Sequence, residues 1–173
     1  MSEKFIEQIE ANRKEYERLL KDDNFTDVRF NPQNGALLAI HKKHHFDATT
    51  GIFGIARGDY EKIAIEVLYD YGRSVILLSE HEGIGIKMPE GLLDGKKFEI
   101  KGIEGTGKRN IIDKISDAGS QGAETIVLYY HDAGLFDLHK IAKAYKGYQK
   151  LSKTMRVQTV YYIVANKLHK IDL

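Results

Sequence analysis

Apolar and polar positions follow two different periods along the chain, and the change of period predicts helices and strands in turn. Residues 2–21 place apolar side chains at helical spacing among many Glu and Lys, and Ser2 is available as the N-cap. Short β-type runs at 27–30 and 36–40 flank a turn-rich stretch of Asn, Pro and Gly. We therefore expect residues 1–58 to form an N-terminal helix and hairpin arm.

The pattern in residues 59–173 predicts one α/β core. Asp59 is the expected N-cap of a helix that runs to Gly72. Residues 125–130 are continuously apolar, which is typical of a strand in the middle of a sheet. The remaining strands are expected at 74–78, 85–93, 96–103 and 157–164, and the remaining helices at 110–123 and around 138–148. This order predicts a mixed β-sheet with helices on both faces.

Length and composition restrict the class of protein. A chain of 173 residues can bury a full hydrophobic core. No apolar run approaches the roughly 18 residues of a membrane span, and the first twenty residues are charged throughout. We expect a soluble, cytoplasmic protein without an export signal or membrane contact. Because cysteine is absent, a metal site would have to use oxygen or histidine ligands.

The net charge of +1 conceals an asymmetry between the two ends of the chain. Residues 135–173 hold eight Lys or Arg and two Asp, a balance of +6, so the rest of the chain lies near −5. A basic half is what a polyanion-binding surface requires, because each neutralised phosphate releases counterions. A solvated, lysine-rich helix is the alternative interpretation.

One predicted strand carries candidate chemistry. Side chains alternate along a strand, so Phe98 and Ile100 are expected to face the core while Glu99 and Lys101 share the other face. A lysine two residues from a carboxylate could polarise an attacking water or hold a phosphate. By itself, such a pair is more commonly an exposed strand pair without a function, and the paired Glu90 with Pro89 before it changes that balance.

A predicted hairpin adds a second carboxylate. Asp94-Gly95 is a strong two-residue hairpin turn, and folding the chain about it places Glu90 opposite Glu99, with Cβ atoms roughly 5 Å apart. Two like charges in this position are unfavourable unless a hard divalent cation such as Mg²⁺ lies between them. A metal-bound hydroxide, Lys101 and a scissile phosphate would suffice for hydrolysis.

Pro89-Glu90 followed by Glu99-Ile100-Lys101 on the next strand resembles the signature of the PD-(D/E)xK nuclease superfamily. The resemblance implies a restriction-endonuclease-like fold and metal-dependent cleavage of phosphodiester bonds with Mg²⁺ or Mn²⁺. Glu90 stands where the family usually has Asp. Its longer side chain must therefore fold back to reach the same ion.

The resemblance also implies roles for two residues outside the hairpin. A helix before the hairpin supplies a further Glu in that superfamily, and Glu61 lies beside the apolar face of the predicted helix, whereas Glu66 lies on its polar side. Glu61, Glu90 and Glu99 would then be the metal ligands. Gln121 matches a glutamine often found on the following helix, where it contacts the site, although a surface glutamine is an equal alternative.

From residue 58 to residue 163 the pattern is similar to the C-terminal toxin domains of contact-dependent growth-inhibition proteins and to related mobile-element domains. The residues concerned run from 60–64 (Tyr-Glu-Lys-Ile-Ala) through Gly72 to Gln121. This resemblance implies RNA, and tRNA in particular, as a substrate favoured over DNA. It further implies delivery into a target cell and an immunity protein as partner. The main alternative is a catalytically inactive nucleic-acid-binding module.

Residues 102–109 nearly match a phosphate-binding P-loop between a strand and a helix. Arg109, however, stands where a Ser or Thr should reach the magnesium ion. A nucleotide hydrolase is therefore the less favoured alternative. We expect instead that Lys108 and Arg109 contact substrate phosphate near a helix N-terminus.

Three histidines, His41, His44 and His45, lie in a basic, turn-rich segment. Such a cluster could bind a metal or act in acid–base chemistry. Without a carboxylate at helical spacing, we interpret it as a solvated loop.

Overall fold

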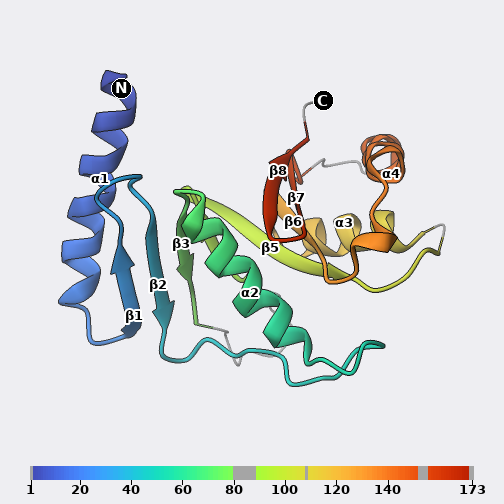
Figure 1. Ribbon diagram of the computed structural model, residues 1–173, viewed down its shortest axis with the longest axis horizontal. Coiled ribbons are helices and arrows are strands. Elements are labelled where there is room, and N and C mark those ends of the chain that lie inside the picture. Colours follow the sequence, from blue (N-terminus) through green and yellow to red (C-terminus); the bar gives the residue numbers. More distant parts are fainter. Residues whose placement is uncertain (1, 80–88, 108, 152–155, 172–173) are drawn as a thin grey trace.

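A single eight-stranded mixed sheet organises the chain (Figure 1). The computed structural model describes residues 2–79, 89–107, 109–151 and 156–171. The strands are β1 (Phe25–Phe30), β2 (Leu37–His41), β3 (Ser74–Leu77), β4 (Gly91–Leu93), β5 (Lys96–Ile103), β6 (Thr125–Tyr130), β7 (Thr159–Val164) and β8 (Lys167–Lys170). The helices are α1 (Glu3–Leu20), α2 (Arg57–Asp70), α3 (Asn110–Ser120) and α4 (Leu138–Leu151), with a 3-10 turn η1 at Ala133–Leu135.

The strands lie in the sheet in their chain order. Whether two neighbouring strands are parallel or antiparallel follows from the segment that connects them. Short turns join the antiparallel pairs β1–β2, β4–β5 and β7–β8, and β3 also pairs antiparallel with β4. The parallel pairs β2–β3, β5–β6 and β6–β7 are each bridged by one helix, α2, α3 or α4 respectively. The expected mixed sheet is confirmed.

Helices cover both faces of the sheet, as the alternation in β6 demonstrates. Val127 and Tyr129 pack with residues of α2, whereas Ile126 and Leu128 pack with residues of α3 and α4. Side chains of successive strand residues point to opposite faces, so α2 covers one face and the α3–α4 pair covers the other. Helix α1 packs Leu19 against the β1–β2 end, on the face opposite α2.

Helix α2 begins differently from the prediction. It starts at Arg57, its N-cap is Ala56, and no side chain caps it, so the expected cap by Asp59 is wrong. The preceding loop supplies the acceptors instead: the carbonyl of Asp47 accepts from Gly58 N at 2.7 Å. Backbone carbonyls from this loop satisfy N–H groups that a capping side chain would otherwise serve.

The C-terminal hairpin contains a strand that the sequence did not indicate. Ala165 and Asn166 both have positive φ, 50° and 59°, as a two-residue hairpin turn of type I′ requires. They return the chain antiparallel to β7 as β8, whose exposed Lys and His side chains hide its strand character. Of the strand expected at 85–93, residues 85–88 lie outside the described part, and β4 occupies its end.

The N-terminal segment is continuous with the rest of the sheet. Ser2 caps α1, since its hydroxyl accepts from Phe5 N at 3.2 Å, as predicted. Strand β2 pairs with β3 from Leu37↔Ser74 to Ile40↔Leu77, so the β1–β2 hairpin extends the core sheet. In the part of the chain that the structure describes, no helix is long and apolar enough to cross a membrane.

Candidate active site

The β4–β5 hairpin has the register predicted from its turn. Gly91 pairs with Phe98, and the two following pairs run to the turn at Asp94 and Gly95. Both turn residues have positive φ, 49° and 83°, which matches the strong preference of a two-residue turn for Asp-Gly. Glu90, the residue before β4, is thereby brought beside β5.

Glu90 and Glu99 are locked together by reciprocal hydrogen bonds. The backbone N of Glu90 donates to Oε1 of Glu99 at 2.9 Å, and the backbone N of Ile100 donates to Oε2 of Glu90 at 2.8 Å. Each carboxylate thus uses one oxygen on a main-chain amide of the opposite strand. The two carboxylates are fixed at the open end of the hairpin with little freedom to separate.

Burial and mutual repulsion make the ionised forms of these carboxylates unfavourable. Burial raises the pKa of Glu90 well above its ordinary value, and the negative charges of Glu61 and Glu99 raise it further. Burial also raises the pKa of Glu99 to about 7, against the opposing effect of Lys101. Glu61 raises the pKa of Glu99 as well. A chain of contacts leads from Glu61 through His44 and Leu78 to Glu90, since Leu78 N donates to the carbonyl oxygen of Glu90 at 3.0 Å.

Glu61 is held on the buried side of α2 by a histidine from the N-terminal segment. It is 6% exposed, while Glu66 is exposed and pairs with Arg29. Nε2 of His44 lies 2.6 Å from Oε1 of Glu61, and Nδ1 of His44 lies 2.8 Å from the carbonyl oxygen of Leu78. A carbonyl oxygen can only accept, so Nδ1 carries a hydrogen and the ring orientation is fixed.

The interpretation of the histidine segment as a solvated loop is therefore wrong for His44, although His45 is exposed. His44 is buried, with its ring edge-on to Phe46 at a centroid distance of 4.9 Å. The contact with Glu61 spans 17 residues between a loop and a helix, so no local period in the sequence could reveal it.

Helix α3 and the residue that caps its C-terminus supply two polar partners to this group. Nζ of Lys101 lies 2.7 Å from Oδ2 of Asp117 and 3.9 Å from Oε2 of Glu99. With its amide nitrogen turned toward Glu99, Gln121 lies 3.1 Å from both oxygens of that carboxylate. The structure thus brings Gln121 to the carboxylates as expected, and it adds Asp117, which the sequence analysis did not single out.

The predicted phosphate-contacting residues lie apart from this cluster or outside the described chain. Arg109 is exposed at the start of α3 and pairs with Asp113 at 3.3 Å. Lys108 lies outside the described residues. The loop before α3 is fastened by Asn110, whose side-chain amide donates to the carbonyl of Gly105 at 2.8 Å.

The donor set fits a hard divalent cation. Glu61, Glu90 and Glu99 all offer carboxylate oxygens, the ligands that Mg²⁺ prefers, and a cation would offset the repulsion that raises the pKa of Glu90 and Glu99. Among the described residues, no three His, Cys, Asp or Glu side chains are arranged as they stand to hold an ion. Each of the three glutamates instead directs an oxygen at a ring or main-chain nitrogen of the protein.

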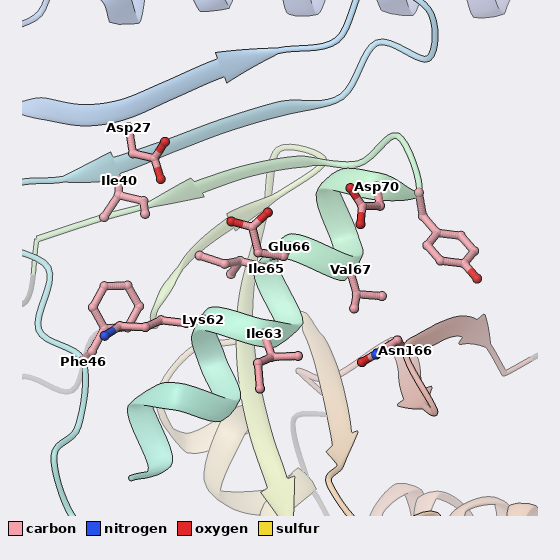
Figure 2. Close-up of a pocket in the computed structure, with 11 residues that line it drawn as sticks. Asp27, Ile40, Phe46, Lys62, Ile63, Ile65, Glu66, Val67, Asp70 and Asn166 are labelled. Atoms are coloured by element: carbon pink, nitrogen blue, oxygen red, sulfur yellow. The ribbon is translucent and has the colours of Figure 1, made fainter. Parts of the chain in front are cut away.

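A groove of about 590 Å³ lies elsewhere, along the exposed side of α2 (Figure 2). Asp27 and Ile40 line it from the β1–β2 hairpin, Lys62 and Glu66 from α2, and Asn166 from the turn after β7. Its lining includes none of the clustered glutamates. We therefore place the candidate chemistry at the β4–β5 hairpin and not in this groove.

Comparison with known proteins finds a shared fold. No protein-family model and no curated protein matches the sequence. The structure is similar to one chain of a solved "CdiA-CT/CdiI toxin and immunity complex from Burkholderia pseudomallei", with a TM-score of 0.50 and 21% sequence identity. The similarity covers 67% of this chain and 84% of that chain. The protein therefore has a mixed α/β fold that is also found in a chain of this toxin and immunity complex.

Proposed function

We propose that the protein is a metal-dependent nuclease that hydrolyses phosphodiester bonds, with RNA, and tRNA in particular, favoured over DNA. One observation carries the proposal: reciprocal hydrogen bonds join Glu90 and Glu99 in the β4–β5 hairpin, and Nζ of Lys101 lies 3.9 Å from Glu99. The negative charge of Glu61 on α2 acts on both carboxylates. Buried carboxylates that repel one another are costly to retain without a function, because each ionised group loses its hydration. Perturbed pKa values of this origin are typical of functional sites.

Each residue of the group has a role in this proposal. Held by Glu61, Glu90 and Glu99, Mg²⁺ or Mn²⁺ would supply Lewis-acid activation of water and neutralise phosphate charge. Lys101 would donate to a phosphate oxygen and stabilise the charge that develops there. Gln121 would orient Glu99 through its amide.

Two further residues would set positions within the site without touching the substrate. His44 would hold Glu61 by its 2.6 Å contact, and Asp117 would aim Lys101 by its 2.7 Å ion pair. Hydrogen-bond partners of this kind orient metal ligands and catalytic groups.

The fold similarity supports a toxin domain as the biological setting. The similar chain comes from a complex whose description names a toxin and an immunity protein. On this proposal, the protein acts in the cytoplasm of a target cell and an immunity protein neutralises it. The preference for tRNA rests on the sequence resemblance to toxin domains of growth-inhibition proteins.

The test is a cleavage assay on total tRNA and on plasmid DNA, with Mg²⁺, Mn²⁺ or excess chelator. Glu99→Gln keeps an acceptor for Glu90 N and removes the charge. Glu124→Gln is the matched control, since Glu124 is exposed on the loop before β6. We expect metal-dependent cutting of tRNA that disappears in Glu99→Gln and persists in Glu124→Gln. Absence of cutting by folded wild-type protein with either metal would refute the nuclease and favour an inactive binding module.

A further inference from the structure

Helix α4 presents a face of positive charge that the site described above does not use. Lys140, Lys143, Lys146 and Lys150 are all exposed, and the helix contains no acidic residue. Their spacing places them on one side of the helix. The opposite side is buried through Ile141, Tyr145 and Tyr148.

This charge pattern differs from that of an ordinary solvated helix, and α1 of the same protein provides the comparison. Helix α1 interleaves Glu with Lys and Arg, and it forms the pairs Arg13–Glu10 and Arg18–Glu15. In the part of the chain that the structure describes, the four exposed lysines of α4 form no ion pair. Like charges three and four residues apart destabilise a helix, so the pattern is unfavourable unless an anion binds there.

The helix with the lysine face packs against a helix that contributes to the candidate active site. Helix α4 crosses α3 where Gly147 packs on Ile112 and the Tyr148 hydroxyl packs on Gly119. Figure 1 shows α4 nearly end-on beside α3. Helix α3 also supplies Asp117, which binds Lys101. Helix α3 thus contacts both the helix that carries the lysines and a residue of the site.

We propose that the exposed face of α4, with Lys140, Lys143, Lys146 and Lys150, binds the phosphate backbone of the nucleic acid. The inference rests on the proposed function in taking a nucleic acid as the substrate. From Lys140 to Lys150 the helix rises about 15 Å. One strand of a duplex advances by about 3.4 Å per phosphate, so this face spans about four phosphates of a strand. The contacts are electrostatic and independent of base sequence.

The test measures binding separately from cleavage. Protein carrying Glu99→Gln is titrated, in chelator, into a fluorescently labelled tRNA and into a labelled DNA duplex. The salt concentration is varied between about 50 and 200 mM, a range over which affinity from phosphate contacts falls steeply. Fluorescence anisotropy then gives Kd and its salt dependence. The variant replaces Lys143, Lys146 and Lys150 by Gln. The control replaces three exposed lysines at the other end of the sheet by Gln, for the same change of net charge: Lys4 and Lys14 in α1, and Lys21, its C-cap residue.

We expect the α4 variant to reduce the slope of log K against log salt by about 2 to 3, because three phosphate contacts are lost. Its affinity should fall at least tenfold at the lower salt concentration, while the α1 control retains the original slope. Equal losses in both variants, or an unchanged slope in the α4 variant, would overturn the proposal. Binding that depends on α4, in a protein that cuts neither polymer, would support this surface while refuting the nuclease.

Discussion

His44 and Glu61 are joined by a contact of 2.6 Å between Nε2 and Oε1, and this contact ties the N-terminal segment to the candidate active site. The imidazole is fixed from its other side by the carbonyl of Leu78, at 2.8 Å from Nδ1. His44 lies in the loop between β2 and α2, and Leu78 directly follows β3. Three separate segments therefore determine where the carboxylate of Glu61 points.

The first prediction is that His44→Ala lowers metal-dependent cleavage by about 10- to 100-fold, the usual effect of removing a partner that orients a metal ligand. The loss should be largest at low Mn²⁺ and partly recovered at high Mn²⁺, because the variant weakens retention of the ion. His45→Ala is the control, since His45 is the exposed neighbour. Cleavage rates measured over a Mn²⁺ series check this. Wild-type rates for His44→Ala at every concentration would show that the contact serves folding alone.

The second prediction concerns stability against pH. Burial raises the pKa of Glu99 to about 7 and that of Glu90 well above its ordinary value. Between the unfolded value near 4.3 and these raised values, the folded protein binds more protons than the unfolded chain. The free energy of unfolding of the metal-free protein should therefore rise as the pH falls from about 7.5 to about 5.5, by up to about 1.4 kcal/mol per pH unit for each carboxyl.

Urea unfolding in chelator at a series of pH values measures this dependence. Glu99→Gln should flatten the curve, because the variant has no proton to bind at that position. Adding Mn²⁺ should stabilise the protein chiefly at the upper end of the range, where the carboxylates are ionised. A metal-free protein whose stability increases steadily with pH over this window would contradict the assignment of the raised pKa values.

Some parts of the candidate site follow from a local sequence pattern, either a turn or a helical spacing, and these parts were predictable from the sequence. The Asp94-Gly95 turn fixes the register that brings Glu90 to Glu99, and helical spacing separates buried Glu61 from exposed Glu66. Residues whose roles arise from packing between distant segments were not predictable. His44 reaches Glu61 because the loop between β2 and α2 folds back toward α2, and no local sequence pattern predicts the course of that loop.

The same distinction applies to the fold. Strand β6 is buried on both faces and is therefore continuously apolar, so its bounds were predicted to the residue. Strand β8 is four residues long and largely exposed, so its sequence carries no apolar alternation. The start of α2 depends on the carbonyl of Asp47 as a tertiary acceptor, and Asp59, a good capping residue by type, lies inside the helix instead.

The third prediction assigns Lys101 a role in the chemical step. Lys101→Met removes the ammonium group and keeps the aliphatic stem, so the cleavage rate should fall by about 10²- to 10³-fold, as for the loss of one transition-state donor. The affinity for nucleic acid should change little, because Lys101 contributes only one positive charge, beside the glutamates. Lys97→Met, at the exposed end of the same strand next to the hairpin turn, is the matched control. Equal rates for the two variants would exclude Lys101 from the reaction.

The fourth prediction tests the close approach of β3 and β4 next to Glu90. A Cβ on Gly91 would lie 2.0 Å from the carbonyl oxygen of Ile76 and 2.9 Å from Cα of Leu77. Both contacts are with main chain, which cannot yield without separating the two strands. Gly91→Ala should therefore destabilise the protein by about 1–3 kcal/mol or more, the range for overpacking, and should lower cleavage by displacing Glu90.

Gly107→Ala is the matched control, because a Cβ there would meet no heavy atom within 4 Å. It should leave the free energy of unfolding within about 0.5 kcal/mol of wild type, as is usual for surface substitutions. Urea unfolding measures the stability of both variants. The cleavage assay is run without denaturant, at a temperature at which both variants are folded. If Gly91→Ala were as stable and as active as Gly107→Ala, the spacing of β3 and β4 could not be what holds Glu90 against Glu99.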